Sequence, residues 1–278
     1  MFVRNVALVT EESAIPMSEL SAVAAALQKQ ASRDFGPLWK VESTVTAFQT
    51  LEQLPLDYWP VIIKDDIGDP TAAGYHDDQH GQPFSLVQYS QGWTLTASHE
   101  VLEMLGDPFG RRLIAGQSPK TGQGRVRFLV EVCDPCEADD FSYSVNGIKV
   151  SDFYTPHYFD PVTSASVRYS YTGAITAPRT VLRGGYLSWH DSATNAWWQR
   201  TWFGDKAHDR QLKDMKVTNG NLRQAIDRVT ALERAKAMKL SGKREVMAAH
   251  SAAPKARPEF AKRASDLRRA VQAATARK

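Results

Sequence analysis

The sequence predicts an α/β fold of the α+β kind, in which a mixed sheet supports a central helix and a β-rich half follows. Three observations predict it. Over residues 1–108 the patterns run strand, helix, strand, strand, strand, helix. Short aromatic strand patterns then continue to about residue 203. From about residue 212 the chain is Ala-rich, basic and helical in its periodicity, which predicts a helical C-terminal extension.

Each element of the first half has a local signal. Four segments are apolar and short, or alternate as strands do: Arg4–Thr10, Lys40–Phe48, Tyr58–Lys64 and Phe84–Tyr89. The first helix is expected over Met17–Phe35, closed by Gly36 and Pro37. Gly74–Pro83, GYHDDQHGQP, is most simply a solvated turn, with a calcium loop and a substrate-lining loop as alternatives.

The second half begins after the polar loop at residues 111–124. Arg125–Val132 has a strand pattern, and Phe141–Val150 predicts a hairpin that turns at Asn146 and Gly147. Helical periodicity returns in Asn221–Leu240, and Phe260–Ala276 predicts a second basic helix. We therefore divide the chain into residues 1–110, 111–204 and 205–278.

Charge separates the last of these parts from the other two. Residues 205–278 hold 19 Lys and Arg against 8 Asp and Glu, whereas residues 1–204 hold 15 against 23. Every Trp and Tyr lies before residue 205. We expect the basic part to extend from the body, because it has too little apolar surface to fold alone. It would bind a protein partner or assembly; nucleic acid is less favoured, because no Trp or Tyr is present for base stacking.

The expected location of the protein and its redox chemistry follow from features that the sequence lacks. No apolar run approaches the length of a membrane span, and the N-terminus has no signal-peptide core, so we expect a cytoplasmic or virion protein with no membrane partner. Cys133 and Cys136 cannot form a disulfide framework. Their C-x-x-C spacing follows a strand rather than opening a helix, which disfavours a redox motif.

The segment Thr94–Pro108, TLTASHEVLEMLGDP, is the most informative one. On a helical wheel, four polar residues fall within about 100° of one another: His99, Glu100, Glu103 and Asp107. The apolar residues between them fall on the opposite side. One side of the helix would thus be buried, and the other would present an imidazole beside three carboxylates, unless it is simply the polar face of a surface helix.

This polar side predicts a metal site. His99 and Glu103, one turn apart, can hold a single ion, and Glu100 beside them can act as general base on a metal-bound water. The pattern is that of the His-Glu-x-x-His metallopeptidase helix, with Glu103 in place of the second His. Asp107 lies about 12 Å from His99 along the axis, too far to share the ion, so it is better placed in a supporting role, as a helix stop or at another ion.

A third ligand must come from elsewhere in the chain. Glu131 is our first choice, and three further residues are candidates in decreasing order of preference: Asp134, His157 and His76. Zinc is the favoured divalent metal. Because the site is rich in carboxylates, manganese, calcium and magnesium are alternatives.

Five short motifs follow one another in the chain, namely GYHD, SHEVLEMLGDP, EVCDP, VSDF with YFDP, and GGY. Together they resemble a bacterial and phage family that is itself similar to the zincin metallopeptidases. The resemblance covers about residues 1–204. It implies a zincin-like mixed sheet that backs the metal helix, with its last strand at the edge beside the substrate cleft. It implies a metal-site fold but names no substrate.

These observations favour a metal-dependent hydrolase, a zincin-like metallopeptidase with an HExxE variant motif and a peptide or protein substrate. The alternative is a zincin-like scaffold without catalysis, used as a structural or adaptor protein, for example in a phage particle. The basic part at residues 205–278 suits that alternative.

Overall fold

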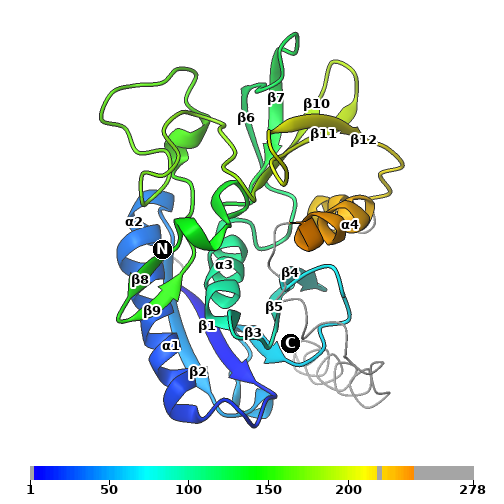
Figure 1. Cartoon of the computed structure of the whole chain (residues 1–278). Coiled ribbons are helices and arrows are strands. Elements are labelled where there is room, and N and C mark those ends of the chain that lie inside the picture. Colours follow the sequence, from blue (N-terminus) through cyan, green and yellow to red (C-terminus); the bar gives the residue numbers. More distant parts are fainter. Residues whose placement is uncertain (1–2, 218–220, 241–278) are drawn as a thin grey trace, which may run out of the picture.

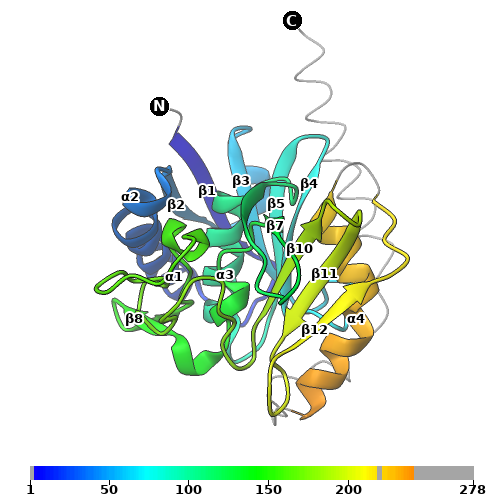
Figure 2. The same cartoon turned by 90° about the horizontal axis from the view of Figure 1, so that it is seen from above.

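A computed structural model describes residues 3–217 and 221–240, with side chains as far as residue 231. It has mixed helix and strand content, as the sequence predicts. The strands form two five-stranded sheets and a two-stranded one. Figures 1 and 2 show helix α3 packed on the first five-stranded sheet and helix α4 beside strand β12 of the second. No helix in these residues is long and apolar enough to cross a membrane.

The first sheet has the strand order β2-β1-β3-β5-β4. Its strands are β1 (Val3–Thr10), β2 (Glu42–Phe48), β3 (Tyr58–Lys64), β4 (Gly74–Gln79) and β5 (Gln82–Gln88). Strands β2, β1, β3 and β5 are parallel, and β4 pairs antiparallel with β5. The sheet is therefore mixed, and its antiparallel strand lies at one edge.

Two helices cover one face of this sheet. Helix α1 (Met17–Lys29) packs on β1 and β2, and α3 (Trp93–Gly106) packs on β3, β4 and β5. The two helices touch each other, so they share a face of the sheet. The helix predicted over Met17–Phe35 continues past α1 as a π-helical turn, Gln30–Phe35, before the single turn α2 (Gly36–Trp39).

The second half forms an antiparallel sheet in the order β12-β11-β10-β7-β6. Its strands are β6 (Leu113–Gln117), β7 (Arg125–Leu129), β10 (Tyr186–Asp191), β11 (Ala196–Thr201) and β12 (His208–Leu212). A separate hairpin joins β8 (Tyr143–Val145) to β9 (Ile148–Val150), and β9 packs on α3. The predicted turn at Asn146 and Gly147 is confirmed, with φ of 52° and 79°.

Short 3₁₀ turns punctuate the chain: Leu51–Gln53, Asp134–Cys136, Asp139–Phe141 and Pro156–Phe159. One hydrophobic cluster extends from β1 through α3 to β10, including Leu8, Leu102 and Trp189. The two halves therefore share a core.

Two expectations about the first sheet are wrong. Gly74–Pro83 is not a solvated turn, because Gly74–Gln79 is strand β4 and His80 and Gly81 form the two-residue turn that leads into β5. The strand before α3 is not the edge strand either. That strand, β5, lies between β3 and β4, so β4 is the edge strand on this side of the sheet. Edge strands often carry polar side chains, and β4 does so. Its sequence therefore resembles that of a loop.

The expected boundary at residue 205 is also wrong. Residues 208–212 form β12, which pairs with β11, and α4 (Leu222–Leu240) packs beside β12. Ala225 and Ile226 of α4 are buried. This helix need not fold alone, because Ile226 packs on a surface that Leu129 and Leu212 already provide. The helix predicted over Phe260–Ala276 lies outside the described residues.

Candidate metal centre

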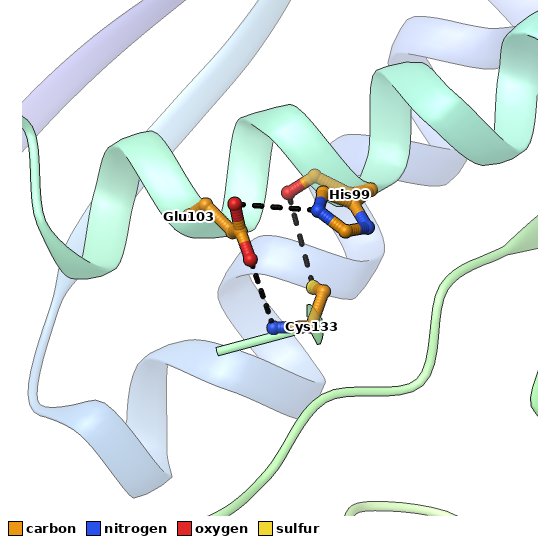
Figure 3. A group of neighbouring side chains, drawn as sticks. All are labelled: His99, Glu103 and Cys133. Carbon is orange, nitrogen blue, oxygen red and sulfur yellow. Dashed lines mark hydrogen bonds and ion pairs between the residues drawn. The ribbon is translucent and has the colours of Figure 1, made fainter. Parts of the chain in front are cut away.

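The centre begins with two side chains on α3. His99 and Glu103 point toward each other, with His99 Nε2 3.3 Å from Glu103 Oε2 (Figure 3). The backbone N–H of Cys133 donates to the other oxygen, Glu103 Oε1, at 3.2 Å. This bond orients the carboxylate so that Oε2 faces the imidazole. The predicted convergence of His99 and Glu103 on one point is therefore present.

The connection after β7 brings two further carboxylates to this point. Asp134 Oδ1 lies 3.3 Å from His99 Nε2. Glu131, Glu103 and Asp134 form a buried group whose ligand atoms all lie within 4.8 Å of one another. The strand was expected over Arg125–Val132, but β7 ends at Leu129, so Glu131 lies just after the strand rather than within it. Asp134 is thus beside His99, and Glu131 is grouped with Glu103 and Asp134.

The spacing and hydrogen bonding of these atoms fit a metal ion. Ligand atoms about 2.1 Å from a tetrahedral ion lie about 3.4 Å apart, close to the two separations of 3.3 Å at His99. Asp134 Oδ1 and Glu131 Oε1 are buried and accept no hydrogen bond. Buried carboxylate oxygens in that state are costly unless a cation neutralises them. The cluster can therefore hold a metal ion.

A second group lies on the other side of Glu103. His76 on β4 places Nδ1 3.5 Å from Glu100 Oε2 and 3.7 Å from Glu103 Oε2, and these three residues form another buried group. The strand approaches α3 closely at Gly74, where a Cβ would lie 2.7 Å from Thr96 Cγ2. Glu100 is therefore next to His76, and its Oε2 accepts no hydrogen bond.

The orientation of His76 follows from its backbone partner. Its Nε2 lies 3.0 Å from the carbonyl oxygen of Asp107, an acceptor that requires Nε2 to carry the proton. Nδ1 then presents its lone pair to the centre, where it accepts an N–H of Arg223. Asp107 itself follows the last residue of α3, and its carboxylate accepts the backbone N–H of Arg112 at 2.6 Å. It acts as a helix stop and supports His76, and belongs to neither group.

Arg223, near the start of α4, enters between the two groups. Its Nη1 donates to Glu103 Oε2, to Glu131 Oε2 and, at 3.0 Å, to His76 Nδ1. The side chain is 7% exposed. A guanidinium from the part of the chain expected to extend into solvent is thus a buried member of the centre.

The charge balance leaves room for a further cation. Four buried carboxyl groups surround one permanent positive charge, that of Arg223: Glu100, Glu103, Glu131 and Asp134. Burial, reinforced by Glu103, raises the pKa of Asp134 to about 8. Burial of His99 by itself lowers its pKa, but the carboxylates of Glu103 and Asp134 outweigh this and hold it well above its ordinary value. Without another cation, the centre retains protons that a divalent ion would displace.

His157 lies away from the centre, whereas Cys133 forms a further metal-compatible group with His99 and Glu103. His157 is 59% exposed, with Nδ1 2.9 Å from Asp160 Oδ2, and joins none of the metal-compatible groups in the described part of the chain. Cys133 and Cys136 are free and buried, and burial raises the pKa of both thiols well above the usual value. This disfavours the thiolate that redox chemistry requires.

Two members of the centre were underrated or missed from the sequence. The sequence places His76 last among the third-ligand candidates, although it belongs to the GYHD motif. Nothing in the sequence marked Arg223, because it lies beyond all the motifs. Comparison of the chain with protein-family models, with curated proteins and with solved structures finds no match.

Proposed function

We propose that this chain is a metal-dependent hydrolase of the zincin-like type, acting on a peptide bond. The observation that carries the proposal is the buried set of His99, Glu103 and Asp134, in which a carboxylate oxygen without a hydrogen bond faces an imidazole at ligand spacing. The HExxE motif leads one to expect His99 and Glu103 as ligands on a helix that packs on a mixed sheet, with a further ligand from another segment.

We assign the ligands as His99 Nε2, Glu103 Oε2 and Asp134 Oδ1, on the two separations at His99, with Glu131, which groups with Glu103 and Asp134, completing the set. The 3.3 Å separations favour zinc, whose bonds to nitrogen and oxygen are about 2.0–2.2 Å long. Manganese, calcium and magnesium remain alternatives, because three of the four ligands are carboxylates.

A bound divalent metal would polarise a substrate carbonyl and lower the pKa of a water ligand. Glu100 is assigned as the general base, because its buried Oε2 accepts no hydrogen bond and is available for the proton of the attacking water. Cys133 and Arg223 position Glu103 from opposite sides. These contacts hold the ligand in a single orientation.

Access to the centre depends on α4. Of the two helix ligands, His99 is 12% exposed and Glu103 is fully buried. Asn221 and Gln224 at the start of α4 donate to the carboxylate of Asp77 on β4, at 2.6 and 3.1 Å. For a peptide to reach Glu100 along the edge strand, this end of α4 has to withdraw.

The same burial favours a second candidate function. Structural metal sites are closed, whereas catalytic sites keep a position open to substrate. A closed centre tied to α4 by Arg223 suits a scaffold without catalysis, in which the ion and the guanidinium hold the two halves of the chain together. This candidate predicts metal without hydrolysis.

One set of measurements separates the two candidates. Elemental analysis of the purified full chain should find a divalent metal that is retained in His157→Ala and lost in His99→Ala and Asp134→Asn. A peptide library should then be cleaved by the wild type, and about 10²–10⁴-fold more slowly by Glu100→Gln at unchanged metal content. Bound metal without cleavage would favour the scaffold. Absence of metal after purification and after incubation with zinc would contradict both candidates.

A further inference from the structure

A second concave site lies at the far end of α3, outside the metal centre. A cavity of about 390 Å³ opens beside Gly106 and Asp107, where the helix ends. Its volume is in the range of pockets for small molecules. Four basic residues line it: Arg4, Lys40, Arg111 and Arg112.

The residues that line the cavity offer these four cations no free carboxylate. Asp107 is the sole carboxylate that lines the cavity, it is 2% exposed, and its Oδ2 is taken by the backbone N–H of Arg112. Among the side chains of residues 3–217 and 221–231, no ion pair joins any of the four to a carboxylate. Residues 1–204 carry more acidic than basic side chains, so a cavity with this surplus of positive charge is a local exception.

Two of the guanidinium groups are held in place by the protein. Arg4 donates to the carbonyl of Leu105 and lies over the ring of Trp59, 5.5 Å from its centroid. Arg112 donates to the carbonyl of Gly106 at 2.8 Å and lies over Trp39 at 5.3 Å.

The carbonyl bonds cap the end of α3, but each uses only one of the five N–H donors of a guanidinium. The other donors remain for a ligand. Burial, together with the charge of Arg112, lowers the pKa of Arg4, as expected for like charges placed together.

We propose that this cavity binds the phosphate group of a small molecule. Arg4, which is half-buried, and Arg112, which is exposed, supply planar donors of the kind that recognise phosphate oxygens in pairs. Lys40 and Arg111, both exposed, add further positive charge. A bound dianion neutralises the repulsion between the two guanidinium groups. The site shares no side chain with the proposed ligands or the general base.

Isothermal titration of the full chain tests this assignment. The probes are inorganic phosphate, O-phosphoserine and, as a singly charged control, acetate. Ionic strength is kept constant, and a chelator removes divalent ions so that phosphate cannot report on the metal centre. Arg112→Gln and Arg111→Gln are compared with Arg125→Gln, an exposed arginine of β7 that does not line the cavity.

We expect saturable binding of phosphate by the wild type and by Arg125→Gln, and at least about tenfold weaker binding by both cavity variants. Arg111→Gln keeps the test valid if Arg112→Gln does not fold, because Arg111 makes no hydrogen bond to α3. A preference for O-phosphoserine identifies a phosphate ester as the ligand, and a preference for phosphate identifies the free anion. Equal affinity for acetate, or equal binding by Arg111→Gln and Arg125→Gln, would overturn the proposal.

Discussion

Arg223 and Glu103 are 120 residues apart in the sequence and form a buried ion pair, in which the guanidinium of α4 donates to the helix carboxylate of α3. Burial by itself lowers the pKa of Arg223, but Glu131 and Glu103 outweigh it and raise that pKa well above the ordinary value. Helix α4 is therefore fixed to the centre by charge as well as by apolar contact.

The pair predicts a large effect of Arg223→Gln on stability. Removing one partner of a buried ion pair costs about 3–5 kcal/mol, because the other charge stays buried without compensation. We expect the free energy of unfolding of the metal-free variant, measured with urea, to fall by about this amount. Arg228→Gln, an exposed change on the same helix, should cost less than about 0.5 kcal/mol.

Divalent metal should reduce the difference between Arg223→Gln and wild type, because the ion supplies positive charge to the same carboxylates. If Arg223→Gln were as stable as Arg228→Gln without metal, the ion pair would not hold the centre together.

Much of the first half was predictable because its signals are local. The apolar runs of β1 and β3 and the alternation of β2 each predict a strand within two residues of the observed bounds. The one-turn spacing of His99 and Glu103 determines that their side chains can meet, whatever packs around them. The general mixed fold follows from the same periodicities.

The errors concern features that only tertiary contacts decide. Strand β4 has polar residues because it is an edge strand, and no local pattern distinguishes an edge strand from a loop. The stripe of Ala225, Ile226 and Val229 on α4 is too short to predict that the helix is part of the body, because its partners Leu129 and Leu212 come from other strands. The role of Arg223 depends on that packing, so it could not be inferred from the sequence.

A second prediction concerns the anchor of α4 on β4. Asn221 donates to Asp77, and its own side-chain oxygen accepts the backbone N–H of Gln224 at 2.8 Å, an N-cap contact. Asn221→Ala removes both bonds, and loss of the cap alone costs about 1 kcal/mol. Backbone amides of the first turns of α4 should exchange with deuterium faster, while those of α3 keep their protection.

If the chain is a hydrolase, Asn221→Ala should also cleave peptides faster, because the centre opens more often. Arg228→Gln serves again as the control. Unchanged exchange in α4 would mean that the contact with Asp77 does not hold the helix.

A third prediction is a pH dependence at Asp34. Burial of this carboxyl raises its pKa, but hydrogen bonds from Arg33, Tyr171 and Tyr143 outweigh it and lower the pKa overall. The two tyrosine hydroxyls donate at 2.8 and 2.9 Å and tie the second half to the π-helical turn Gln30–Phe35 that follows α1. A carboxylate with a lowered folded pKa stabilises fully above its unfolded pKa of about 3.9, and this is lost as pH falls through the folded value.

Wild type should therefore exceed Asp34→Asn in stability by a constant amount from neutral pH to about pH 5, and this excess should shrink below about pH 4. Urea titrations at several pH values measure the difference. Asp139→Asn, at an exposed ion pair with Lys149, should show a much smaller effect throughout. An excess that grows on acidification would contradict the lowered pKa.

The last prediction concerns the basic residues beyond α4. Because α4 belongs to the body, the part available to a partner starts later than residue 205, and residues 241–278 still hold 10 Lys and Arg against 3 Asp and Glu. We expect a chain ending at Leu240 to keep the stability and metal content of the full chain, and to lose association with an acidic protein partner. A chain ending at Val217 lacks Arg223 and should be destabilised at least as much as Arg223→Gln.

Binding of the full chain to polyglutamate and to duplex DNA, measured over a range of salt concentrations, distinguishes the partners, because release of condensed counterions gives DNA the steeper salt dependence. Equal binding by the full chain and the chain ending at Leu240 would exclude residues 241–278 as the site of association.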